Sequence, residues 1–283
     1  WRCRTILKLS KRESIRLRTV LSYCTKSTES AQRSVKHWNR RENMAYTTQV
    51  VPVSYKQTDR RWANKPYRNK GENSTIGGSG CGPTCAAMLV ATFVDKSETP
   101  VKACNWAQNH GYKATGSGTY YTFFKAYLKA HRMDCEQVPG SNSYHKRNTS
   151  SDKKAKAALK AGKYVIACMG PGLWTRGGHF ILLRKIKGNT VYIHDPASSA
   201  KSRNKNTWDN VQYQAKYYWI IEPGKIAYFK ANNAPIRYSE SKKSKIVARG
   251  KKNQKVYINK EVKSWNRIGY HRWVHNVRLK KSA

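Results

Sequence analysis

Residues 78–90 constrain the fold of this chain more than any other stretch, and they read GSGCGPTCAAMLV. The glycines allow unusual backbone angles, and the apolar run that follows suits a buried helix. Cys81 is therefore predicted to lie where a loop becomes a helix. There the free N–H groups and the helix dipole favour a thiolate, the nucleophilic form of cysteine. The alternative is that Cys81 and Cys85 are simply small buried residues.

A cysteine nucleophile needs a histidine to exchange its proton and a third group to orient that histidine. Two downstream segments supply these groups beside strand-like runs: GGHFILL at residues 177–183 and VYIHDP at residues 191–196. A turn at residues 187–189 joins the two runs into a hairpin, which brings His179 and Asp195 to neighbouring strand ends. His194 is a rival base. Adjacent strand residues point to opposite faces, so His194 and Asp195 do not address one site.

In this order, Gly-Cys-Gly-Pro-Thr, Gly-Gly-His-Phe and His-Asp-Pro resemble the C39-like branch of the papain-like cysteine peptidases. The segment YKQTDRRWA at residues 55–63 is similar to the Gln motif of that family, and the resemblance covers residues 50–223. It implies peptide-bond hydrolysis by Cys81, with His179 as general base and acid and Asp195 orienting the imidazole. Gln57 is then expected to stabilise the oxyanion.

The substrate cleft is expected to include the glycines around the nucleophile and the loop before the histidine. The cleft residues are Gly80, Gly82, Trp174 and Gly178. Trp174 is predicted to form a wall of the cleft, and a packed tryptophan is the alternative interpretation.

The pattern of elements predicts an α+β fold, with helices first and an antiparallel sheet afterwards. Capping signals and apolar spacing indicate helices at residues 99–109, 120–131 and 151–161. Short β-branched and aromatic runs indicate strands at residues 49–55, 164–169, 178–186, 190–194 and 217–221. This helical half plus antiparallel sheet agrees with the papain-like fold that the motifs imply.

Glu222-Pro223-Gly224 is interpreted as a boundary, which predicts a peptidase domain over residues 44–223 and a second domain over residues 224–283. Short strands separated by turns indicate a small all-β barrel in this tail. Its order resembles a bacterial SH3-like domain, with Arg272 in place of the expected glycine and Pro235-Ile236 in place of Asn-Val. The resemblance implies a cell-wall-binding domain. The tail carries 17 Lys and Arg against 2 Asp and Glu.

The formal net charge is +41, from 56 Lys and Arg against 15 Asp and Glu. Such a field attracts polyanions such as nucleic acid, an anionic cell wall or a membrane surface. No zinc-finger spacing, RNP-like strand or basic heptad segment indicates specific nucleic-acid binding. Anionic wall polymers are therefore the expected partners, the alternative being a surface merely solvated by lysine. No apolar run reaches the roughly 18 residues that a membrane-spanning helix needs.

Seven cysteines, an odd number in a chain of this length, indicate mostly free thiols. A zinc site on Cys81 and Cys85 is the alternative. No second Cys/His pair has compact ligand spacing, so neither a metal nor another cofactor is expected.

Residues 1–43 carry 12 Lys and Arg against 3 Asp and Glu and show no signal-peptide pattern. We expect a poorly ordered basic leader, with a basic helix over residues 6–21 as the alternative. The codons for residues 40–43 can spell a ribosome-binding site, so the hypothesis is that native translation begins at Met44.

Together these features predict a bacterial or phage cysteine peptidase that acts on the peptide part of peptidoglycan, as an endolysin or wall hydrolase does. It is expected outside the cell or at the cell wall, with phage-type release in the absence of a signal peptide. Two alternatives stay open. One is a C39-type peptidase that processes exported peptides, and the other is a non-catalytic wall-binding or polyanion-binding protein.

Overall fold

The computed structural model describes residues 50–138, 145–269 and 271–281. The predictions of a basic leader over residues 1–43 and of a start at Met44 lie outside the described residues. Contacts group Ala45–Ala283 as one unit.

The first half of this unit is helical. The helices are α2 (Ile76–Ser79), α3 (Cys81–Phe93), α4 (Pro100–Asn109), α5 (Thr122–Ala130) and α6 (Ser150–Lys160). Helices α2, α4 and α6 each begin at a threonine whose side chain caps the helix. The Thr99 side chain caps α4, which has Pro100 in its first turn. Thr149 and Asp152 form a capping box on α6. Every residue of α3 except Thr92 is buried, so α3 is the central helix of this half.

A six-stranded antiparallel sheet follows, in the order β1-β6-β2-β3-β4-β5. Its strands are β1 (Asp134–Val138), β2 (Tyr164–Met169), β3 (His179–Lys187), β4 (Thr190–His194), β5 (Lys205–Thr207) and β6 (Ala215–Glu222). Two short helices, α7 (Lys201–Asn204) and α8 (Trp208–Gln214), flank β5.

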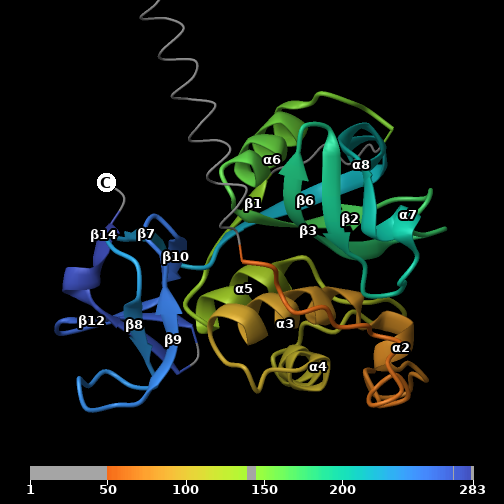
Figure 1. Cartoon of the computed structure of the whole chain (residues 1–283). Helices are drawn as coiled ribbons and strands as arrows, with labels where there is room; N and C mark the ends of the chain where they lie inside the picture. Colours follow the sequence, from red (N-terminus) through yellow and green to blue (C-terminus); the bar gives the residue numbers. More distant parts are fainter. Residues whose placement is uncertain (1–49, 139–144, 270, 282–283) are drawn as a thin grey trace, which may run out of the picture. The chain divides into compact units, whose positions relative to one another are not determined.

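The sheet lies between two helical layers, with α3, α4 and α5 on one face and α6 and α8 on the other (Figure 1). Side chains of β2 alternate between them. Ile166 and Cys168 join the core around α3, while Val165 and Ala167 join the core around α6. A strand buried on both faces reads as a continuous apolar run, which is how YVIACM appears in the sequence.

Most predicted elements are confirmed, two of them with their bounds, and the antiparallel α+β arrangement is confirmed as well. The strand expected over residues 49–55 is wrong, because residues 50–55 form no strand. Side chains hold this segment instead: the Val53 N–H donates to Thr92 Oγ1 at 3.0 Å. β1 was not predicted. Its sequence, DCEQV, is mostly polar, and it is an edge strand that pairs only with β6.

The described residues after Glu222 form an all-β region with its own small core. Its elements are β7 (Lys225–Phe229), β8 (Ala234–Arg237), β9 (Ile246–Gly250), β10 (Lys255–Ile258), β11 (Lys260–Val262), β12 (Trp265–Gly269), β13 (Arg272–His275), the 3₁₀ helix η1 (Asn276–Arg278) and β14 (Leu279–Lys281). They make sheets of three and five strands. The predicted β region is confirmed, whereas its SH3-like identity stays a prediction.

The all-β region packs against the helical half of the unit through β10. Tyr257 belongs to the core around α3, with its ring centroid 5.7 Å from that of Phe93. Its hydroxyl donates to the Gly162 carbonyl. Beside it, Lys255 Nζ donates to the Ala161 carbonyl at 3.0 Å, and burial lowers the pKa of this lysine to about 8.

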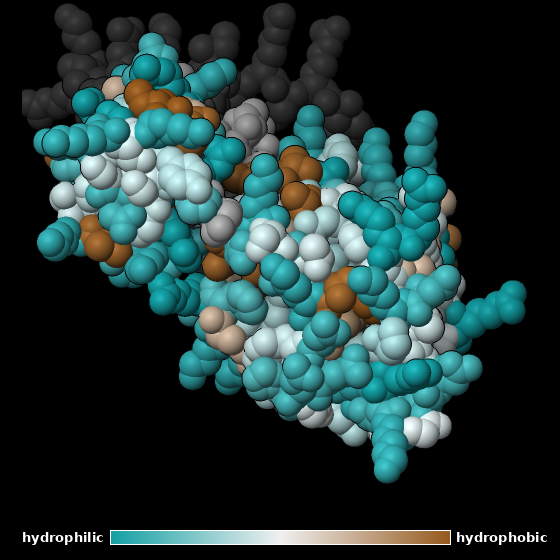
Figure 2. Space-filling view, turned by 90° about the horizontal axis from the view of Figure 1, so that it is seen from below, coloured by the Kyte–Doolittle hydropathy of each residue, from teal (hydrophilic) through white to brown (hydrophobic). Residues whose placement is uncertain are grey.

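The surface agrees with the basic, hydrophilic composition. Hydrophilic side chains cover most of the face in Figure 2, where hydrophobic residues form small separate patches. Among the described residues, no helix has the length and apolar character needed to cross a bilayer. The five cysteines in the described ranges are all free.

Candidate active site

Cys81 is the first residue of α3, directly after the one-residue joint at Gly80 that ends α2. The joint requires glycine, because an added Cβ would lie 2.7 Å from the Ile76 carbonyl oxygen. Cys81 keeps 9% of its surface exposed. Its thiol therefore lies at the positive end of a 13-residue helix, within reach of solvent.

His179 and Asp195 come together at one end of the β3–β4 hairpin. His179 is the first residue of β3, and Asp195 follows the last residue of β4. His179 Nε2 donates to Asp195 Oδ1 at 2.8 Å, and the Asp195 side chain is completely buried. The bond to the carboxylate fixes the tautomer and leaves Nδ1 for the thiol.

Cys81 and His179 interact, and each shifts the pKa of the other. Burial raises the pKa of the thiol, but the hydrogen bond and the charge of His179 outweigh it and hold the pKa below its ordinary value. Burial lowers the pKa of His179, but hydrogen bonds to Asp195 and Cys81 raise it to about 9. Between these two pKa values the pair exists as thiolate and imidazolium.

His194, the rival base, faces away from this pair. Its Nε2 lies 3.0 Å from the Pro52 carbonyl oxygen, and burial lowers its pKa to about 4. It is neutral at neutral pH and has no contact with the thiol.

Asp195 has more partners than the sequence indicated. Its Oδ1 also accepts from the Ala197 N–H at 2.8 Å, and its Oδ2 accepts from Arg203 Nε at 2.5 Å. Burial raises the pKa of Asp195, but the hydrogen bond and charge of His179, with these further partners, hold it below its usual value. Arg203 belongs to α7 and was missed, since nothing marks it among 56 Lys and Arg.

Arg203 also fixes the loop that carries Trp174. Its Nη2 donates to the Trp174 carbonyl at 2.7 Å, and Trp174 Nε1 donates to the Arg203 carbonyl at 2.9 Å. Trp174 is 2% exposed and lies in the core around α6. The interpretation of Trp174 as a cleft wall is therefore corrected: it is a packed residue that connects this loop to the partner of Asp195.

Gln57 is buried between the segment after Asp195 and the turn before Cys81. Its backbone N–H donates to the Pro196 carbonyl at 2.8 Å, and its Nε2 donates to the Gly77 carbonyl at 2.7 Å. The adjacent Lys56, also missed, donates through Nζ to the Asp195 carbonyl at 2.6 Å. Through these bonds, segment 56–57 contacts both Asp195 and the turn that precedes α3.

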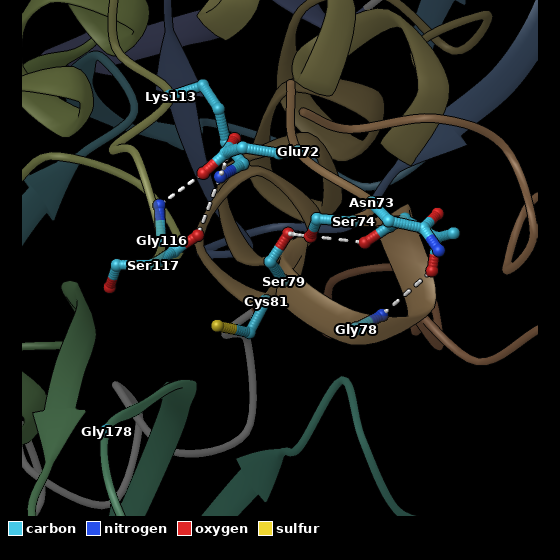
Figure 3. Close-up of a pocket in the computed structure, with 12 residues that line it drawn as sticks. Glu72, Asn73, Ser74, Gly78, Ser79, Cys81, Lys113, Gly116, Ser117 and Gly178 are labelled. Atoms are coloured by element: carbon cyan, nitrogen blue, oxygen red, sulfur yellow. Dashed lines mark hydrogen bonds and ion pairs between the residues drawn. The ribbon is translucent and has the colours of Figure 1, made fainter. Parts of the chain in front are cut away.

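A pocket of about 560 Å³ opens beside Cys81 (Figure 3). Residues from segments 72–81 and 113–118 line it, together with Gly178. Of the predicted cleft glycines, only Gly178 lines this pocket. Gly82 packs against α5 and β3 instead, since an added Cβ would lie 3.2 Å from the Phe124 ring and 3.3 Å from the Phe180 ring. Gly80 is the helix joint described above.

The described residues contain no group of three or more His, Cys, Asp or Glu side chains arranged to hold a metal ion.

Comparison with known families gives a match to the model of the Peptidase C39 like family over residues 31–222. Among solved structures, the peptidase domain of Streptococcus ComA, a bi-functional ABC transporter involved in quorum sensing, is 13% identical with a TM-score of 0.36; the match covers 51% of this chain and 91% of that one. A putative C39-like peptidase from Bacillus anthracis is 15% identical with a TM-score of 0.30, covering 50% and 88%. Ly7917 is 14% identical with a TM-score of 0.23, covering 71% and 92%. No curated protein matches.

Proposed function

The chain belongs to the Peptidase C39 like family, and from this premise we propose that it is a cysteine peptidase that works through Cys81, His179 and Asp195. The observation that carries the proposal is the connected arrangement of these groups. A thiol at a helix N-terminus has its pKa lowered by an imidazole, and this imidazole donates to a buried carboxylate. This is the arrangement that nucleophilic catalysis requires.

In the proposed mechanism the Cys81 thiolate attacks the peptide carbonyl carbon and forms a tetrahedral intermediate. The backbone N–H of Cys81, which lies at the helix start, and the Gln57 carboxamide stabilise the oxyanion. His179 then donates its proton to the leaving amine as the C–N bond breaks, which leaves a thioester on Cys81. Water attacks the thioester, gives its proton to His179, and releases the carboxylic acid and the thiolate.

Gln57 is suited to this role by its burial and its anchoring. It is 4% exposed, and one N–H of its carboxamide is fixed on the Gly77 carbonyl, which leaves the second N–H for a ligand. A donor held in place before substrate arrives costs no reorganisation during the reaction.

We further propose that the substrate is the peptide portion of peptidoglycan and that the enzyme acts outside the cell or at the cell wall. The net charge of +41 supports this, since bacterial walls carry anionic polymers. In this proposal the all-β region over residues 224–283, with 17 basic against 2 acidic residues, binds the wall as an SH3-like domain.

The direct test of the catalytic proposal is thiol alkylation at pH 7 with mass mapping of each labelled cysteine. Cys81 should react at least about tenfold faster than Cys85, whose pKa burial raises well above normal. Cys81→Ala should abolish turnover and keep the fold. Cys85→Ala should keep turnover and cost about 1 kcal/mol of stability through lost packing. Equal labelling of all cysteines, or full activity of Cys81→Ala, would contradict the proposal.

A further inference from the structure

The pocket beside Cys81 is lined by glycines and by residues with polar groups, with no aliphatic or aromatic side chain among them. Apart from Cys81 itself, every lining residue is a glycine or carries a hydroxyl, amide or charged group. Ligand pockets are more commonly lined by aliphatic and aromatic side chains. The residue types that line the pocket therefore restrict which substrate groups it can bind.

The two charged lining residues neutralise each other and hold the pocket together. The Lys113 side chain is 1% exposed, and its Nζ lies 3.2 Å from Glu72 Oε2. The same Nζ donates to the carbonyls of Ala114 and Ser117, each at 2.7 Å. Glu72 in turn accepts from the Gly116 N–H, and its backbone hydrogen bonds lower its pKa to about 2. The pair fixes segment 113–118 and leaves no unpaired charge on the lining.

Three of the four hydroxyl groups are also engaged within the protein. Ser74 Oγ and Ser79 Oγ are 2.7 Å apart, and Thr75 Oγ1 accepts from the Gly78 N–H at 3.3 Å (Figure 3). These bonds fix the wall of the pocket that leads to Cys81. The hydroxyl oxygens of Ser74, Thr75 and Ser79 therefore form a rigid frame, already hydrogen-bonded within the protein.

Asn73 and Ser117 differ from this frame. Both are exposed, and within the described ranges neither side chain has a hydrogen-bond partner. They come from the two segments that form the pocket, one on each (Figure 3). A carboxamide and a hydroxyl are thus available to a ligand in the pocket, both uncharged and both able to donate and accept.

From this lining we infer that the pocket binds an uncharged polar group of the substrate, a hydroxyl or carboxamide, next to the scissile bond, and disfavours bulky apolar side chains. The inference rests on the proposed peptidase function and adds a substrate class to it. A leucine in this pocket would strip water from the polar lining without replacing the lost hydrogen bonds. A glutamine of similar size would replace them through Asn73 and Ser117.

The test uses the whole chain and matched peptides in which Gln or Leu stands at each of the two residues flanking the cut, with the cut mapped by mass spectrometry. At the residue that enters the pocket, kcat/KM should be about tenfold or more higher for Gln than for Leu. Asn73→Leu combined with Ser117→Ala should bring that ratio close to one and keep the Cys81 alkylation rate. Equal or faster cleavage of the Leu peptides at both positions overturns the inference.

A pair of neighbouring glycines provides a steric control. An added Cβ at Gly177 or Gly178 meets nothing within 4 Å, so a valine at either position should preserve the fold, which Tm verifies. Only Gly178 lines the pocket. Gly178→Val should therefore raise KM for the Gln peptides several-fold, and Gly177→Val should not. Equal effects of the two variants would contradict the placement of substrate in this pocket.

The alkylation rate separates the two ways of failing. If the wild-type chain cuts peptides without preference while Cys81 is hyper-reactive, the inference alone fails. If no peptide is cut and Cys81 labels no faster than the other cysteines, the proposed function fails and the inference falls with it.

Discussion

At the scale of single residues, the site depends on keeping Asp195 charged although its side chain is completely buried. A buried carboxylate without compensation takes up a proton or destabilises the fold. His179 compensates one oxygen and Arg203 the other. The hydrogen bond of Asp195 to His179 is then available to hold the imidazole tautomer, so Arg203 acts as a positioning residue through Asp195.

Replacing Arg203 tests this role. Arg203→Met keeps the length of the side chain and removes the charge, so the pKa of Asp195 should rise and the acid limb of the pH–rate profile should move upward. We expect kcat to fall about tenfold or more and Arg203→Lys to restore part of it. Lys201→Met, an exposed change in the same helix, is the control. A variant with lowered Tm and an unmoved acid limb would show a purely structural role.

The coupled pKa values of Cys81 and His179 predict a pH window for catalysis. The pKa of Cys81 is lowered, so the thiolate is present above that value. The pKa of His179 is raised to about 9, so the imidazolium is present below about pH 9 and is lost above it. Activity should therefore fall on the alkaline side near pH 9, measured as kcat/KM against pH.

Asp195→Asn and His194→Gln separate the contributions to this alkaline limb. Asp195→Asn should move it to lower pH and reduce kcat by up to about 10⁴-fold, because the amide holds the wrong tautomer. His194→Gln should leave it in place, since His194 is neutral throughout the window. An alkaline limb that follows His194 instead would make His194 the base.

At the scale of elements, the sequence predicts best where a local pattern and a motif coincide. β4 was predicted with its bounds because VYIH is enclosed by a turn and by Asp195-Pro196. Cys81 and His179 could be found because each is the first residue of such an element. Residues 50–55 show a similar apolar run and yet form no strand. Their backbone groups bond to the side chains of Thr92, Tyr164 and His194, which no local pattern reveals.

The residues that sequence reasoning missed share one property: their structural role depends on tertiary contacts and shows no local sequence pattern. Lys113 is unremarkable in a chain with 56 Lys and Arg until its side chain is found buried against Glu72. Trp174 was misjudged for the same reason, since burial separates a wall of a cleft from a packed residue. Sequence motifs therefore identified the reacting groups. The residues that hold those groups in place could be identified only from the fold.

The joint between α2 and α3 gives a prediction at this scale. Gly80→Ala would place a Cβ 2.7 Å from the backbone oxygen of Ile76, so the start of α3 has to shift. We expect a loss of about 1–3 kcal/mol in the free energy of unfolding and a fall in Cys81 alkylation rate. Gly177→Ala, with open space around the added Cβ, should change neither. If Gly80→Ala is alkylated at the wild-type rate, the reactivity of the thiol does not depend on the exact position of the start of α3.

At the scale of the whole molecule, the all-β region packs into the core of the peptidase half. It is also the region that we propose binds walls. Tyr257 is 3% exposed and fills the core beside Phe93 and Tyr164. Deleting residues 225–283 would open that core, so a deletion confounds targeting with stability. Tyr257→Ala measures the structural part alone, and it should cost about 3–5 kcal/mol in a denaturant titration.

The wall-binding role needs a variant that leaves the docked strand intact. Four exposed lysines lie outside β10 and suit a quadruple change to glutamine: Lys242, Lys243, Lys251 and Lys252. This variant should keep the wild-type Tm and sediment less with purified walls. Wild-type binding should weaken with salt, because the screening length is only about 10 Å at 0.1 M, and the variant should show a shallower salt dependence. Walls stripped of anionic polymer should bind both proteins equally weakly. If the variant sediments like the wild type at low salt, these charges of the tail do not target the enzyme to walls. The role of the all-β region is then the structural one, the core contact made by Tyr257.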